Sequence, residues 1–72
     1  MQVSNSVEDG SSIVFLSPRD VTQRTSLSRS TLERWSQEGR FPAPVPLGDY
    51  RKAWIEEEVI AWQKAAVAGR DG

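Results

Sequence analysis

The 72-residue sequence contains no cysteine and no histidine. Their absence excludes disulfide bonds, the thiolate and imidazole ligands of structural zinc sites, and any Ser-His-Asp or Cys-His catalytic arrangement. The carboxylates are not placed to converge in pairs either, since the only dense cluster consists of three consecutive glutamates at 56–58. An enzyme is therefore the weakest functional hypothesis, and we expect neither a cofactor nor a metal site.

Long apolar runs are also missing. No stretch approaches the ~20 apolar residues of a membrane span, and the N-terminus lacks the basic and then apolar order of a signal peptide. These features predict a cytoplasmic protein with no membrane contact. A chain of this length buries only roughly 60% of the surface that its unfolded form exposes, so we expect one small domain without a deep catalytic cavity.

What the sequence does contain is typical of a globular domain, with 38% hydrophobic residues, 26% charged residues and three tryptophans. Residues 1–12 are polar and have no periodic apolar set, which predicts a flexible arm. We expect the folded domain to span residues 13–68. Residues 69–72 are expected to fray.

Four consecutive apolar residues at 13–16 predict a short strand that is buried on at least one face and requires a partner strand. A helix is predicted to begin at Pro18. Ser17 is a favoured N-cap residue, proline suits the first helical position, and Asp20 favours the positive end of the helix dipole.

A second helix is predicted from Arg29 to about Glu38, after a tight connection. Ser28 can cap its start, and Gly39 can adopt the left-handed conformation that ends many helices. Leu32 and Trp35 lie about 60° apart around this helix, because successive residues are separated by about 100°. These two residues therefore mark the side of the helix that we expect to pack against the rest of the domain.

The second half of the chain predicts a hairpin and a third helix. Residues 45–47 and 52–54 are candidate strands, with Gly48 at the bend between them, and they follow an extended segment in which prolines alternate. The last helix is predicted over about residues 56–67, with its leading glutamates stabilised by the helix dipole. Its apolar stripe, expected to be core, consists of Ile55, Val59, Trp62 and Ala66.

The side of the second helix opposite Leu32 and Trp35 is polar. Such a side can simply be solvated, but a helix-turn-helix places the N-terminal half of its second helix in the DNA major groove. Arginine can form two hydrogen bonds with guanine, and hydroxyl groups can reach base edges or phosphates. We therefore predict that the second helix binds duplex DNA through Ser28, Arg29, Ser30, Thr31 and Arg34.

Charge is distributed unevenly along the chain. The whole chain has a net charge of −1, whereas residues 18–54 carry seven basic and four acidic side chains, a net charge of +3. The hairpin is in the place of a wing that follows the DNA backbone or enters the minor groove, with an ordinary polar turn as the alternative. Candidate wing contacts are Tyr50, Arg51 and Lys52, and Arg24 and Arg40 are candidate phosphate contacts for which solvent exposure is the alternative.

Three segments together resemble the AlpA-like regulators and excisionases of bacteriophages and other mobile elements, a branch of the MerR-like winged-helix proteins. These segments read "LSRSTLERW" at 27–35, "EGRFPAPVPLG" at 38–48 and "WIEEEVIAW" at 54–62. The resemblance covers about residues 13–64. It departs from the family pattern at Tyr50, where such proteins often have a basic residue.

The resemblance implies a mainly α fold with a small β-sheet, a winged helix-turn-helix in the order β-α-α-β-β-α. It also implies DNA binding in a bacterial cytoplasm, with a role either in transcription or as an excisionase, a recombination directionality factor that acts on an integrase. We expect either several copies on adjacent sites or a dimer. The alternative is a protein-interaction module without DNA binding, whose surface would combine Trp35, Ile60 and the proline-rich segment.

Overall fold

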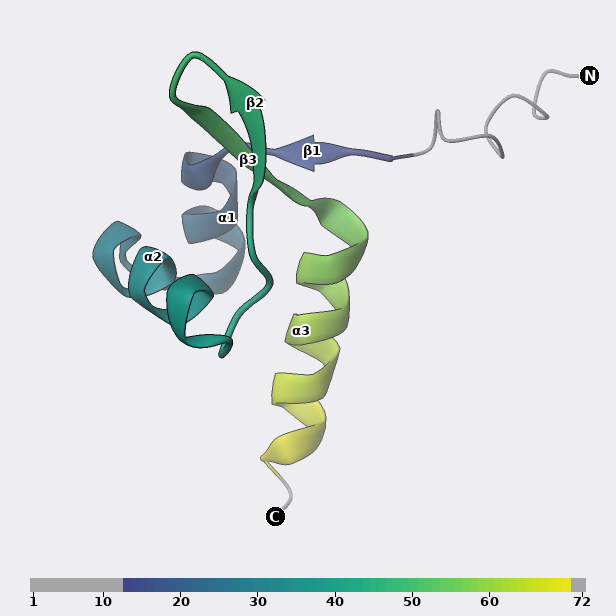
Figure 1. The fold of residues 1–72 in the computed structure, drawn as a ribbon. Coiled ribbons are helices and arrows are strands. Elements are labelled where there is room, and N and C mark those ends of the chain that lie inside the picture. Colours follow the sequence, from purple (N-terminus) through teal and green to yellow (C-terminus); the bar gives the residue numbers. More distant parts are fainter. Residues whose placement is uncertain (1–12, 71–72) are drawn as a thin grey trace, which may run out of the picture.

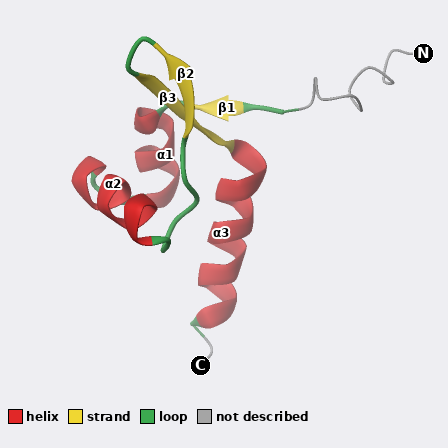
Figure 2. Cartoon of the chain, in the orientation of Figure 1, coloured by secondary structure: helices red, strands yellow, loops and turns green. Residues whose placement is uncertain are grey.

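The computed structural model describes residues 13–70, so the predicted arm at 1–12 and the end at 71–72 lie outside the described residues. The elements follow one another in the predicted order (Figures 1 and 2). The winged helix-turn-helix prediction is confirmed. The elements are β1 (Phe15–Leu16), α1 (Pro18–Thr25), α2 (Arg29–Glu38), β2 (Val45–Gly48), β3 (Arg51–Ile55) and α3 (Glu56–Gly69).

The first two helices begin and end at residues with suitable local chemistry. Ser17 caps α1 by accepting a hydrogen bond of 3.1 Å from the backbone of Asp20, whose carboxylate accepts one of 3.4 Å in return from the backbone of Ser17. Ser28 caps α2, and Gly39 ends it in the left-handed conformation with φ of 79°. Both predicted helix starts are confirmed. The sequence can predict them because a cap residue bonds to backbone groups within a few residues of itself.

The sheet has the order β1-β3-β2 and is antiparallel. The first strand is shorter than predicted, since only Phe15 and Leu16 pair with β3. Within the expected strand 13–16, only Leu16 is buried, while Ile13, Val14 and Phe15 are 45–53% exposed. The expected length of four residues was wrong because β1 is an edge strand that pairs with β3 over two residues only. Val14 adds one backbone hydrogen bond, which its carbonyl accepts from Glu56 at 2.9 Å.

The hydrophobic core lies where α1, α2 and α3 meet the sheet. Its buried residues are Leu16, Val21, Leu32, Phe41, Trp54 and Val59, with Leu27, Trp35 and Trp62 packed against them. Two tryptophans also fix the segment that follows α2. Trp54 Nε1 donates a hydrogen bond of 2.7 Å to the carbonyl of Pro42, and Trp62 Nε1 donates one of 2.9 Å to the carbonyl of Arg40.

The third helix departs from prediction at its C-terminal end. It continues to Gly69, beyond the predicted end at Val67. Ala66 was expected in the core, but it is exposed, and so are residues 64–70 as a whole. Figure 1 shows the reason, because the last turns of α3 extend past the ends of the other elements. Of the predicted stripe, Val59 is therefore fully buried and Trp62 packs against the core, whereas Ala66 lies beyond it.

Candidate nucleic-acid interface

The polar side of α2 is uncovered by the rest of the fold. Arg29, Ser30 and Arg34 are all exposed, whereas Leu32 is fully buried and Trp35 is half-buried on the docked side. This division follows from helical periodicity, since one strip of apolar side chains is enough to anchor a helix of this length. The docking side predicted from the sequence is therefore confirmed.

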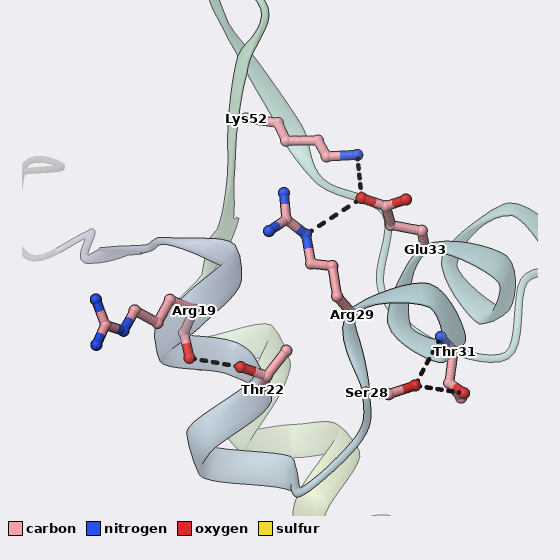
Figure 3. Close-up of polar contacts among 7 residues, drawn as sticks. All are labelled: Arg19, Thr22, Ser28, Arg29, Thr31, Glu33 and Lys52. Carbon is pink, nitrogen blue, oxygen red and sulfur yellow. Dashed lines mark hydrogen bonds and ion pairs between the residues drawn. The ribbon is translucent and has the colours of Figure 1, made fainter.

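Two of the three hydroxyl residues at the start of α2 are hydrogen-bonded to each other. Ser28 Oγ accepts a hydrogen bond of 3.2 Å from the backbone of Thr31 and donates one of 2.9 Å to the Thr31 hydroxyl (Figure 3). The cap therefore also orients the Thr31 side chain. Ser30, which lies between them, is exposed.

The β2–β3 hairpin forms the wing, and its turn has an unusual backbone. Asp49 and Tyr50, the two residues between the strands, both have positive φ, at 51° and 65°. Positive φ at both central residues is the pattern of a type I′ hairpin turn, which asparagine and glycine adopt most readily. The Tyr50 side chain is fully exposed at this turn, and Arg51 beside it is also exposed.

One carboxylate joins the second helix to the wing. Glu33 Oε2 lies 3.2 Å from Arg29 Nε and 3.5 Å from Lys52 Nζ (Figure 3). Arg29 is one helical turn before Glu33, whereas Lys52 comes from β3. Two of the predicted DNA contacts are thus brought together by an acidic residue.

A groove of about 480 Å³ lies between the wing, β1 and the start of α1, and Arg29 of α2 contributes to its wall. We call it the helix–wing groove. Four predicted contact residues, Arg29, Tyr50, Arg51 and Lys52, contribute to its walls, and its other lining residues are Phe15, Ser17, Pro18, Leu47 and Ala53. Sequence reasoning missed the last five. Three of them come from β1 and the start of α1, which only the folded chain brings to the wing.

Two predicted contacts lie away from this groove and have partners within the chain. Arg24 forms an ion pair of 3.0 Å with Glu56 at the start of α3. The guanidinium of Arg40 lies 4.3 Å from the centre of the Trp35 ring and forms an ion pair of 3.2 Å with Glu38. A phosphate would have to compete with these acids for either arginine.

Within residues 13–70, no three His, Cys, Asp or Glu side chains are grouped so that they could hold a metal ion. None of the helices in the same range has the length and apolar composition needed to cross a membrane.

The fold and the exposed helix define a winged helix-turn-helix protein whose second helix has an open polar side. Residues 14–67 match the family described as "Prophage CP4-57 regulatory protein (AlpA)". The chain belongs to this family of prophage regulatory proteins, which confirms the resemblance to AlpA-like regulators.

A curated relative is "Uncharacterized protein ORF88" of Enterobacteria phage P4, which is 41% identical to this chain over 56 residues. The match covers 78% of this chain and 64% of that protein, so the chain spans just under two thirds of the length of its relative. No solved structure gives a significant match.

Proposed function

We propose that this protein binds duplex DNA in a sequence-dependent manner and acts without catalysis, as a regulatory protein of a phage or another mobile element. The observation that carries the proposal is the exposed polar side of α2, with Arg29, Ser30 and Arg34 uncovered near its start. In a major groove, the Arg34 guanidinium could form paired hydrogen bonds with guanine, and the Ser30 hydroxyl could reach a base edge or a phosphate. Arg29, which lies beside Lys52 of the wing, could bind a phosphate.

The wing supplies the second part of the proposed interface. Tyr50 and Arg51 are exposed at its turn, and Lys52 lies between the wing and α2. A wing in this position would follow the phosphate backbone or enter the minor groove. Ser28 and Thr31 are proposed phosphate contacts at the start of α2, with Arg24 and Arg40 at the periphery.

The distribution of charge is compatible with this function despite the net charge of −1. Residues 18–54, which include α1, α2 and the wing, carry a net charge of +3, and residues 55–72 carry −2. No residue of α3 lines the helix–wing groove. A modest number of phosphate contacts should therefore give binding that weakens steeply with added salt.

The proposed biological output is either control of a promoter or excision of a mobile element. The family is regulatory. An excisionase would also contact an integrase or recombinase and bend DNA so that distant sites come together. Footprinting on DNA that flanks the protein's own coding region separates the two outputs, since protection beside an attachment site indicates excision and protection over a promoter indicates transcription control.

The primary test is a fluorescence titration of the protein with mixed-sequence duplex DNA at two salt concentrations. We expect binding at low salt that is lost as salt increases, because phosphate contacts release counterions. The rival hypothesis, that the protein is a protein-interaction module, predicts no binding to duplex DNA even at low salt. In the folded chain, Trp35 packs against Trp62 and lies under Arg40, which leaves little of its ring for a partner protein.

A further inference from the structure

The strongest unexplained feature is an acidic side chain in the middle of the proposed DNA-binding surface. A carboxylate close to DNA phosphates repels them, so Glu33 should weaken binding unless it has a separate role. Its Oε2 atom contacts both Arg29 Nε, at 3.2 Å, and Lys52 Nζ, at 3.5 Å. Two cations from different elements thus converge on a single oxygen atom.

A phosphate oxygen makes the same kind of contact as this carboxylate oxygen. Both are anionic acceptors, and both attract an arginine and a lysine at once. The position of Glu33 Oε2 between helix and wing is therefore a position at which a DNA phosphate could take the same two donors. In Figure 3, the Arg29 and Lys52 side chains both extend toward this point, whereas Arg19 extends away from it.

The contacts that hold Glu33 are weak enough to be exchanged. Side-chain exposure is 58% for Arg29, 39% for Glu33 and 37% for Lys52. Ion pairs as exposed as these change an equilibrium constant by at most about fivefold each. Their distances are also longer than the roughly 2.7–2.9 Å of strong charge-assisted hydrogen bonds. A phosphate can therefore displace the carboxylate without disturbing the fold.

We propose that Glu33 occupies, in the free protein, a phosphate-binding position formed by Arg29 and Lys52, and that a DNA phosphate displaces it on binding. The cost of this displacement lowers the affinity for DNA of any sequence. Base contacts by the rest of α2 must then supply more of the binding energy. Glu33 acts through its two partners and is a positioning residue that limits sequence-independent binding. This inference rests on the proposed function.

The test compares Glu33→Gln with wild type in binding to mixed-sequence duplex DNA over a series of salt concentrations. Glutamine has nearly the same shape but no charge, so the fold should be kept, which circular dichroism and thermal unfolding check. We expect the affinity at low salt to rise roughly tenfold, since two ion pairs no longer have to be given up. The slope of log affinity against log salt concentration should become steeper by up to about 0.9. In wild type, the displaced carboxylate takes up a cation and offsets part of the counterion release from DNA, whereas the variant has no such carboxylate.

Glu58→Gln is the matched control. Glu58 is exposed near the start of α3, forms no ion pair with any of residues 13–70, and the variant loses the same unit of charge. We expect at most a small gain in affinity from this variant. An equal gain in both variants would show that only net charge matters and would overturn the inference.

A second comparison tests whether the effect passes through the proposed phosphate-binding position. In a Lys52→Ala background, Glu33→Gln should give a clearly smaller gain, because one of the two donors is missing and the substitutions are coupled. An undiminished gain would overturn the inference, as would wild-type or lower affinity of Glu33→Gln alone. If neither wild type nor Glu33→Gln binds DNA at low salt, the proposed function fails as well. If wild type binds and Glu33→Gln merely equals it, only the role of Glu33 fails.

Discussion

At the residue scale, the exposed arginines of α2 carry the most direct prediction. Arg34→Ala should weaken binding to the preferred DNA sequence by about 1–3 kcal/mol if the side chain reads a base, whereas Arg29→Ala should weaken binding to DNA of any sequence, because Arg29 is proposed to hold a phosphate. Lys64→Ala is the control, because it removes one positive charge from an exposed position on α3. Fluorescence anisotropy with labelled duplexes measures all three. Wild-type affinity in both arginine variants would remove α2 as the recognition helix.

The buried side of the same helix predicts a different outcome. Leu32 is fully buried in the core. Leu32→Ala should lower the free energy of unfolding by about 2–5 kcal/mol, because it removes buried methyl groups and leaves a cavity. Ser30→Ala, at an exposed position on the other side, should stay within about 0.5 kcal/mol of wild type. Urea denaturation followed by tryptophan fluorescence measures both, and similar losses would contradict the assignment of the two sides.

At the scale of an element, the turn of the wing combines backbone strain with exposure. Tyr50 has φ of 65°, and its fully exposed ring gains no packing in return. Tyr50→Asn should raise the free energy of unfolding by about 1 kcal/mol, since asparagine adopts the left-handed conformation more readily. It should also weaken DNA binding, because asparagine lacks both the ring, which can stack on a sugar, and the phenolic hydroxyl group, which can donate a hydrogen bond to a phosphate.

Thermal unfolding and the DNA titration check the two halves of this wing prediction separately. Tyr50→Phe is the control, since it keeps both the strain and the ring and loses only the hydroxyl group. A Tyr50→Asn protein that is more stable and binds DNA as well as wild type would show that the wing tip does not contact DNA.

The elements also differ in how far the sequence predicts them. The starts of α1 and α2 and the end of α2 were predicted correctly, because Ser17, Ser28 and Gly39 act on backbone groups within a few residues. The length of the strand at 13–16 and the burial of Ala66 were predicted wrongly, whereas the existence of this strand and of a partner strand was confirmed. A local apolar pattern does not show whether another element covers it. Burial of these residues depends on the assembled fold.

The candidate interface shows the same limit. The exposed side of α2 follows from helical periodicity, so its residues could be predicted from the sequence. The contact between Glu33 and Lys52 and the contribution of Phe15 to the helix–wing groove could not, because they depend on how β3 and β1 are placed beside α2. Periodicity within one element carries no information about its neighbours.

At the scale of the whole molecule, the proposed interface lies apart from the C-terminal end of α3. The proposed interface lies at the wing end, and the exposed last turns of α3 extend in another direction (Figure 1). A single module of this kind buries only roughly 600–1,000 Å² on DNA. A region with a net charge of +3 can also make only a few phosphate contacts. The small buried area and the few phosphate contacts both favour weak binding by one copy.

Weak binding by one copy predicts that several copies act together on natural DNA. Footprints should consist of protected segments about 10 base pairs apart, the helical repeat that places neighbouring copies on the same face of the duplex. A duplex with several such segments should show successive shifted bands in gel electrophoresis and a steeper binding curve than a duplex with one. The one-segment duplex is the control for the affinity of a single copy. If it binds as tightly as the longer duplex and saturates with one copy, the protein acts alone, and its single interface must then contribute far more contacts than α2 and the wing offer.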